Sequence, residues 1–335
     1  MAMNVGGAIT PAMNHTERLL FKPFAMQKWL ALGFASLLAG CGGTGSFHVN
    51  LPSNRLPRDI PFDEIVKWVI THMALIVVGV VLLLLVGLAL LWLGSVFKFV
   101  YINLLTRDPR AIRDPFGRFI SLGTSYLLWE LAFGAVTLTL MAALIGAPLL
   151  AAFARSPGEF GAAQVLAVAW AVIVGIVIVL AATVVGIFAR DFVTAAMFVR
   201  NVRVIGGWRI VLPIIKANPG QCALYVLMLI AIALVTGIGS LLVLIVVGIA
   251  FLIPGGLLAL IGWAIYSAGG WSPLLVGYCA LMGLALVLAF SYVMNCATQP
   301  FVVFRRTFAL VVVGQADPAL ATVPGTLPEG RTEVG

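Results

Sequence analysis

Long apolar runs dominate the chain, and they lack the alternation of polar and apolar faces seen in helices of soluble proteins. Three of these runs, at 68–93, 131–154 and 161–189, contain no Asp, Glu, Lys or Arg. A fourth, at 217–304, is much longer and is also uncharged. A helix of about 20 apolar residues crosses the hydrocarbon core of a bilayer, because all its backbone hydrogen bonds are internal. The pattern therefore predicts an all-α, polytopic bundle of transmembrane helices.

The fourth run is long enough for more than one span. Turn-forming residues interrupt it at three places: 218–220, 254–256 and 269–273. They leave full spans at 222–253 and 274–297. The piece between them, 257–268, is too short to cross and is expected to be re-entrant or interfacial. An alternative division at 236–240 gives three spans instead of two.

The distribution of Lys and Arg decides between these divisions. A weaker apolar run near Trp29 brings the count to six spans, and only four basic residues then fall on one side: Arg55, Arg58, Lys67 and Arg155. The other sixteen of the 20 fall on the opposite side. Because basic residues concentrate in cytoplasmic loops, both termini are expected in the cytoplasm. Three spans after Lys216 would place Arg305 and Arg306 outside, so we predict six spans, with seven as the alternative.

Three regions follow from this pattern. Residues 1–18 form an N-terminal cytoplasmic segment, and residues 19–313 form the transmembrane domain. Residues 314–335 are rich in Pro, Gly, Thr and Glu and are expected to be a disordered tail.

Two segments on the cytoplasmic side combine apolar and basic residues. In 204–215 the apolar residues have helical spacing and basic residues flank them, which predicts a short interfacial helix bent at Pro213. Phenylalanines around a pair of arginines repeat the pattern near residue 305. Anchoring at the membrane surface is one interpretation. The sharper hypothesis is contact with anionic lipid headgroups through five residues: Arg203, Arg209, Lys216, Arg305 and Arg306.

Ionisable residues within or near the spans are candidate functional positions, because they are costly in a bilayer. Glu130 is the strongest candidate and is expected to pair with Arg118 or Arg190 or to be protonated, or else to lie at headgroup level. Arg190 and Asp191 close the span at 161–189, and an adjacent pair at a helix end is typical of the membrane interface.

Composition and motifs exclude several classes of protein. The 335 residues are 62% hydrophobic and 10% charged, whereas a soluble domain carries about 25% charged residues. The net charge of +8 is not accompanied by Lys/Arg runs with interleaved aromatics, so no nucleic-acid partner is expected. Phosphate-binding Gly-rich motifs, HExxH, GxSxG and CxxC are all absent from the sequence. We therefore predict no catalytic, cofactor-binding or metal-ligating residue and no enzyme activity.

The segment 37–43, LLAGCGG, raises the question of lipidation. Leu38, Ala39, Gly40 and Cys41 resemble the lipobox of lipoprotein signal peptides, in which the cysteine is acylated. Basic residues followed by a short apolar run are compatible with that reading. The alternative is that Cys41 starts a loop after the first span.

Four stretches resemble an uncharacterised family of bacterial polytopic membrane proteins: LLFKPFAMQKWLALGF (19–34), ARDFVTAAMFVRN (189–201), GWRIVLPIIKANPGQCALYVL (207–227) and TQPFVVFRRTFAL (298–310). That family is similar to the membrane domain attached to some glycerophosphoryl diester phosphodiesterases. The resemblance implies a bacterial inner membrane location. It implies no catalytic residues, because that chemistry belongs to a separate soluble domain.

Two functional hypotheses remain from the sequence. The first is a non-enzymatic integral membrane protein, an envelope or lipid-associated accessory component. Its expected partners are membrane lipids, other copies of the chain or other membrane proteins. The second is a small transporter or channel, with Glu130 and the predicted break at Pro254, Gly255 and Gly256 lining a path.

Overall fold

The computed structural model describes residues 3–41, 67, 70–107, 113–155, 161–270 and 272–323. This part of the chain is 92% helical and contains no strand. In chain order the elements are η1 (Gly6–Ala8), α1 (Ile9–Phe21), α2 (Met26–Cys41), α4 (Met73–Thr106), α5 (Arg113–Met141), η2 (Ala142–Gly146), α6 (Ala147–Arg155), α7 (Ala162–Phe188), η3 (Ala189–Val193), α8 (Thr194–Arg200), α9 (Val204–Ala217), α10 (Pro219–Gly269), α11 (Pro273–Ala297), α12 (Gln299–Ala316) and η4 (Pro318–Leu320).

The predicted class of all-α membrane protein is confirmed. Within the described residues, five helical segments are long and apolar enough to cross a membrane: Met73–Thr106, Phe116–Ala154, Ala162–Arg200, Pro219–Gly269 and Pro273–Ala297. The predicted count of about six is close to this. The remaining predicted span corresponds to α2, which has 16 residues, fewer than the about 20 that a perpendicular crossing needs.

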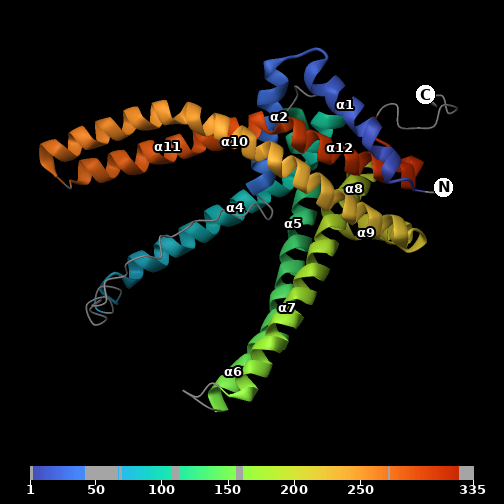
Figure 1. Ribbon diagram of the computed structural model, residues 1–335, viewed down its shortest axis with the longest axis horizontal. Coiled ribbons are helices and arrows are strands. Elements are labelled where there is room, and N and C mark those ends of the chain that lie inside the picture. The colour runs from blue at the N-terminus through green and yellow to red at the C-terminus, as the bar shows by residue number, and fades with distance from the viewer. Residues whose placement is uncertain are drawn as a thin grey trace.

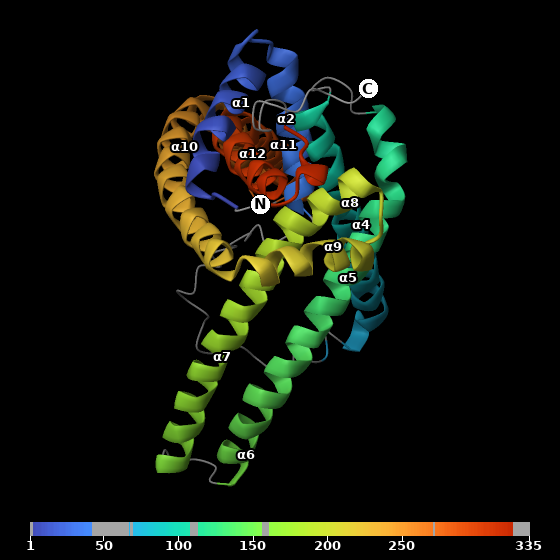
Figure 2. The ribbon, with the colours of Figure 1, turned by 90° about the vertical axis from the view of Figure 1, so that its right-hand side faces the viewer.

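The helices divide into a packed centre and long projections (Figures 1 and 2). We call the centre the hub; it comprises α1, α2, α8, α9, α12 and the buried stretch 94–105 of α4. Three arms project from it: the first part of α4, the hairpin of α5–η2–α6 with α7, and the hairpin of α10 with α11. Along the arms most large apolar side chains are exposed, whereas hub side chains such as Phe99, Val193 and Phe308 are fully buried.

Helix α10 overturns two expectations. The predicted break at 254–256 and the re-entrant piece at 257–268 are both wrong, because the helix runs unbroken over 51 residues with Pro254 inside it. The alternative division at 236–240 fails for the same reason. Helices in lipid tolerate Pro and Gly, since local adjustments satisfy the few freed backbone groups. The turn into α11 occurs at Gly270, whose φ of 64° favours glycine.

The length of α10 shows that it serves two purposes. At about 1.5 Å per residue it is roughly 75 Å long, more than twice the thickness of a hydrocarbon core of about 30 Å. Its first turns bury Cys222, Tyr225 and Leu229 against the hub. The remainder leaves the hub and pairs with α11 to form an arm (Figure 1).

Both ends of the described chain pack on the hub. The Asn4 amide donates to Gln315 Oε1 over 3.3 Å, and His15 Nε2 lies 3.0 Å from the Leu105 carbonyl oxygen. The tail predicted from residue 314 starts inside α12, which continues to Ala316 with Gly314 buried. Residues 324–335 lie outside the described residues, so disorder there stays a prediction.

Polar side chains tie the hub helices together across large sequence separations. Tyr101 of α4 donates to Gln299 Oε1 of α12 over 3.2 Å. The amide nitrogen of Gln299 donates in turn to Ser36 Oγ of α2 over 2.7 Å. Gln299 is fully buried, and this chain of bonds satisfies its side chain without water. It therefore fixes the relative positions of α2, α4 and α12.

Close approach of α4 and α5 depends on a glycine. A methyl group placed on Gly123 would lie 2.7 Å from Val96 Cα and 2.8 Å from Val96 N. These are backbone atoms and cannot rotate away. Gly134, further along the same helix, has no neighbouring atom within 4 Å of such a methyl group.

We expect Gly123→Ala to destabilise the protein and Gly134→Ala to leave it unchanged or slightly stabilised. Overpacking against a backbone costs about 1–3 kcal/mol, whereas alanine in an open helical position gains up to about 1 kcal/mol over glycine. Thermal unfolding of both variants in detergent measures the difference. Equal melting temperatures for the two variants would show that α4 and α5 are not in close contact.

Candidate functional site at the junction of the arms

The candidate site is organised around a π-helical turn, η3, which joins α7 to α8 without ending the helix. The segment is helical from Ala162 to Arg200. The expectation that Arg190 and Asp191 mark a helix end is therefore wrong. A π turn holds an extra residue and redirects the side chains that follow, and such turns occur often at functional sites. Here it brings Asp191 into the hub, where its side chain is only 4% exposed.

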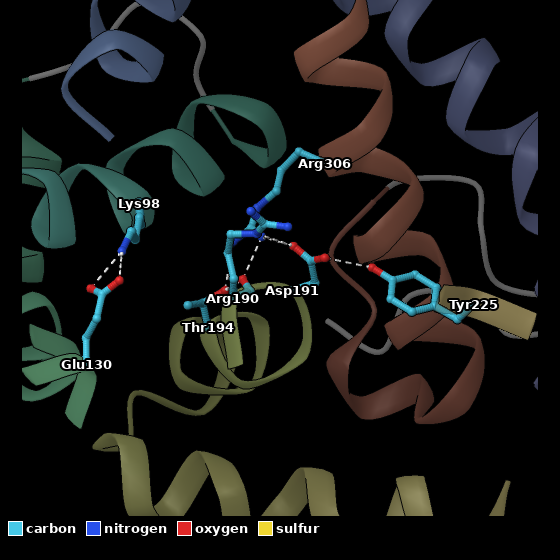
Figure 3. A network of polar contacts seen from close by, with 7 residues as sticks. All are labelled: Lys98, Glu130, Arg190, Asp191, Thr194, Tyr225 and Arg306. Carbon is cyan, nitrogen blue, oxygen red and sulfur yellow. Dashed lines mark hydrogen bonds and ion pairs between the residues drawn. The ribbon is translucent and has the colours of Figure 1, made fainter. Parts of the chain in front are cut away.

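Three side chains share the Asp191 carboxylate (Figure 3). Arg306 Nη1 donates to Oδ1 over 2.9 Å, and Arg190 Nε donates to the same oxygen over 3.3 Å. The hydroxyl of Tyr225 donates to Oδ2 over 3.0 Å. Both carboxylate oxygens therefore have charged or polar partners, as a buried charge requires.

The Arg306 guanidinium forms its hydrogen bonds inside the protein. Its Nη1 also donates to the Arg190 carbonyl over 2.6 Å, and its Nη2 donates to Thr194 Oγ1 over 2.7 Å. The Thr194 hydroxyl donates to the same Arg190 carbonyl, and the Arg306 side chain is 11% exposed. The sequence placed Arg306 among the lipid contacts. In the structure its guanidinium bonds to protein acceptors instead.

Aromatic rings pack around the Tyr225 side of the network. Tyr225 stacks on Phe308 of α12 with ring centroids 5.9 Å apart, and it meets Phe192 edge to face at 5.1 Å. All three rings are fully buried. Charge-assisted hydrogen bonds are stronger in such a buried environment than at a surface. The network therefore links η3, α8, α10 and α12, which come from distant parts of the sequence.

Glu130 forms a second ion pair at the base of the arms. Lys98 Nζ lies 3.2 Å from Oε1 and 3.0 Å from Oε2 of Glu130, and 4.6 Å from the centre of the Tyr126 ring. The expected partners, Arg118 and Arg190, were wrong. The sequence offered no way to find Lys98, since the pairing depends on the register between α4 and α5. The Glu130 side chain is 31% exposed and the Lys98 side chain 9%.

The other predicted positions lie away from this junction. Arg203, Arg209 and Lys216 are exposed on α9, the helix expected at 204–215. Cys41 is the last residue of α2, and its side chain lies outside the described part of the structure. Its lipidation stays a prediction.

The arrangement favours structural and binding roles. Among the described residues no group of three His, Cys, Asp or Glu side chains is placed to hold a metal ion. Glu130 belongs to the α5 arm and Pro254 to the α10 arm, and these arms project in different directions (Figure 1). The structure therefore does not bring together the two features expected to line a transport path.

We expect Asp191→Asn to cost about 3 kcal/mol of stability, because it leaves the buried Arg306 charge uncompensated. Tyr225→Phe removes one hydrogen bond and should cost about 1 kcal/mol. Glu17→Gln is the matched control, since Glu17 pairs with Lys22 at an exposed surface, where ion pairs contribute little. Denaturation in detergent gives the order of stability. An Asp191→Asn protein as stable as Glu17→Gln would contradict the structural role of the network.

Comparison with known proteins identifies the family but not the function. The sequence profile of a family of unknown function, DUF7544, matches residues 3–323. No curated protein and no solved structure matches the chain. The comparisons show no link to glycerophosphoryl diester phosphodiesterases.

Proposed function

We propose a function from the structure itself, because the chain belongs to DUF7544, a family whose function is unknown. The role that fits the geometry best is a non-enzymatic integral membrane protein that acts as a lipid-associated accessory component of its membrane. In this proposal the arms lie in the bilayer and the hub lies at one of its surfaces.

The main support for the proposal is that the apolar side chains of the arms are exposed. In three of the five candidate spans, none of the most apolar 18-residue window is buried within the protein. Apolar patches of this size are not stable in water and mark contact with lipid or with other proteins. Helices exposed around most of their circumference offer acyl chains a large surface, so lipid is the partner that these arms fit best.

The distribution of charge supports one orientation of the hub. The hub carries both ends of the described chain and most of the basic residues, whereas the described tips of the arms carry few. The positive-inside rule then places the hub on the cytoplasmic side. The exposed Arg203, Arg209 and Lys216 of α9 would lie at the headgroups of that leaflet.

The resemblance of four stretches to an uncharacterised family of bacterial polytopic membrane proteins is compatible with an accessory role, because it carries no catalytic residues to this chain. The same resemblance supports a bacterial inner membrane as the location.

Native mass spectrometry of the protein extracted in mild detergent tests the proposal. We expect the full-length chain to retain lipids, and reconstituted vesicles to show no solute flux. Flux that disappears in Glu130→Gln would instead favour a transporter. Retention of no lipid, under conditions that preserve lipids on a control membrane protein, would also contradict the proposal.

Cysteine labelling tests the orientation. In a background with the four natural cysteines replaced by alanine, an impermeant maleimide added to intact cells should label Ser267→Cys near the tip of the α10 arm. It should not label Thr10→Cys in α1 until the membrane is opened. Both positions are exposed, so the reverse pattern would show that the hub faces outward.

A further inference from the structure

Among the described residues, the charged groups at the junction of the arms do not balance. Arg190 and Arg306 both pair with the Asp191 carboxylate, and Arg305, the neighbour of Arg306 on α12, is half-buried. Lys98 and Glu130 neutralise each other. The described part of the junction therefore holds two more positive charges than negative ones. Partly buried charge without a counter-charge is unfavourable in a low-dielectric setting, so the excess calls for an anion.

Two guanidinium groups have donors to offer that anion. Arg190 uses Nε for Asp191, and no described residue accepts a hydrogen bond from its Nη1 or Nη2; its side chain is 36% exposed. Arg305 is half-buried beside Arg306, and among the described residues it has no hydrogen bond or ion pair. Burial lowers the pKa of the Arg305 guanidinium, and the positive charge of Arg190 acts in the same direction.

We propose that Arg190 and Arg305 bind a phosphate group at the junction of the arms. A guanidinium presents paired N–H donors that match the oxygens of a phosphate. A lipid phosphodiester contributes one negative charge, which reduces the excess of two positive charges in the described part of the junction. This inference rests on the proposed function for the source of the phosphate: an anionic lipid headgroup, with its acyl chains along the apolar arms.

The geometry favours a lipid over a soluble ion. The apolar arms meet at the hub (Figure 1), where the Arg190 side chain is 36% exposed. A headgroup placed there would leave its acyl chains in contact with the helices that bear the ligands. Inorganic phosphate would satisfy the same donors without using the arms, and the experiment separates these sources.

The test titrates the full chain in neutral detergent with phosphatidylglycerol, diacylglycerol or inorganic phosphate, with binding followed by native mass spectrometry and by melting temperature. We expect wild type to bind phosphatidylglycerol at least about tenfold more tightly than diacylglycerol, which has no phosphate, as loss of a charge-assisted hydrogen bond would imply. Arg305→Gln should remove most of that preference. Arg209→Gln, which deletes an exposed charge on α9, should change it less than about twofold.

The ligand-free proteins give a second readout. Because Arg305→Gln removes an uncompensated charge, it should melt at the same temperature as wild type or higher in neutral detergent. Phosphatidylglycerol should then raise the melting temperature of wild type and leave that of Arg305→Gln unchanged. Arg305→Lys keeps the charge without the paired donors and should recover only part of the effect.

Several outcomes are decisive. An effect of inorganic phosphate that equals that of phosphatidylglycerol and is lost in Arg305→Gln supports the site with a soluble ligand and overturns its lipid source. Equal binding of both lipids, or an Arg305→Gln protein that behaves as wild type, overturns the site.

If lipids are retained without headgroup preference, the site fails and the accessory role stands. Solute flux together with a phosphatidylglycerol preference that depends on Arg305 would leave the site and remove the accessory role.

Discussion

The buried carboxylate of Asp191 is the interaction on which the hub depends. It lies in a π turn and accepts bonds from Arg190, Arg306 and Tyr225, so one side chain fixes η3, α10 and α12 together. A buried ion pair adds little net stability over an apolar pair, but loss of one partner is costly. The network therefore acts mainly by selecting one arrangement of helices whose apolar surfaces alone would pack in many ways.

The apolar helices that form the arms need such specificity where they meet in the hub. In a bilayer there is little hydrophobic driving force between helices, so close packing and polar contacts have to hold them. The described structure uses both devices: Gly123 lets α5 approach the backbone of Val96, and Gln299 connects α2, α4 and α12. The arms contain few such contacts and spread apart, which leaves their surfaces available to lipid.

The same hub combines a structural and a binding task in neighbouring residues of α12. Arg306 bonds to protein acceptors, whereas Arg305 meets no described acceptor. Adjacent residues on a helix point about 100° apart, so the two guanidinium groups have different surroundings. This division makes the two roles separable by mutation.

The sequence by itself determined the class, five of the spans and the helix at 204–215, because hydropathy and helical spacing are local properties. It also singled out Glu130, Arg190 and Asp191, because charge is rare in an apolar chain. Only the tertiary structure decided their partners: Lys98 pairs with Glu130 through the register of two helices, and Tyr225 and Arg306 reach Asp191 from 34 and 115 residues away. The tertiary structure also decided that α10 continues through Pro254. Turn residues break a helix in water, but they are tolerated where neighbouring groups or local adjustments satisfy the backbone.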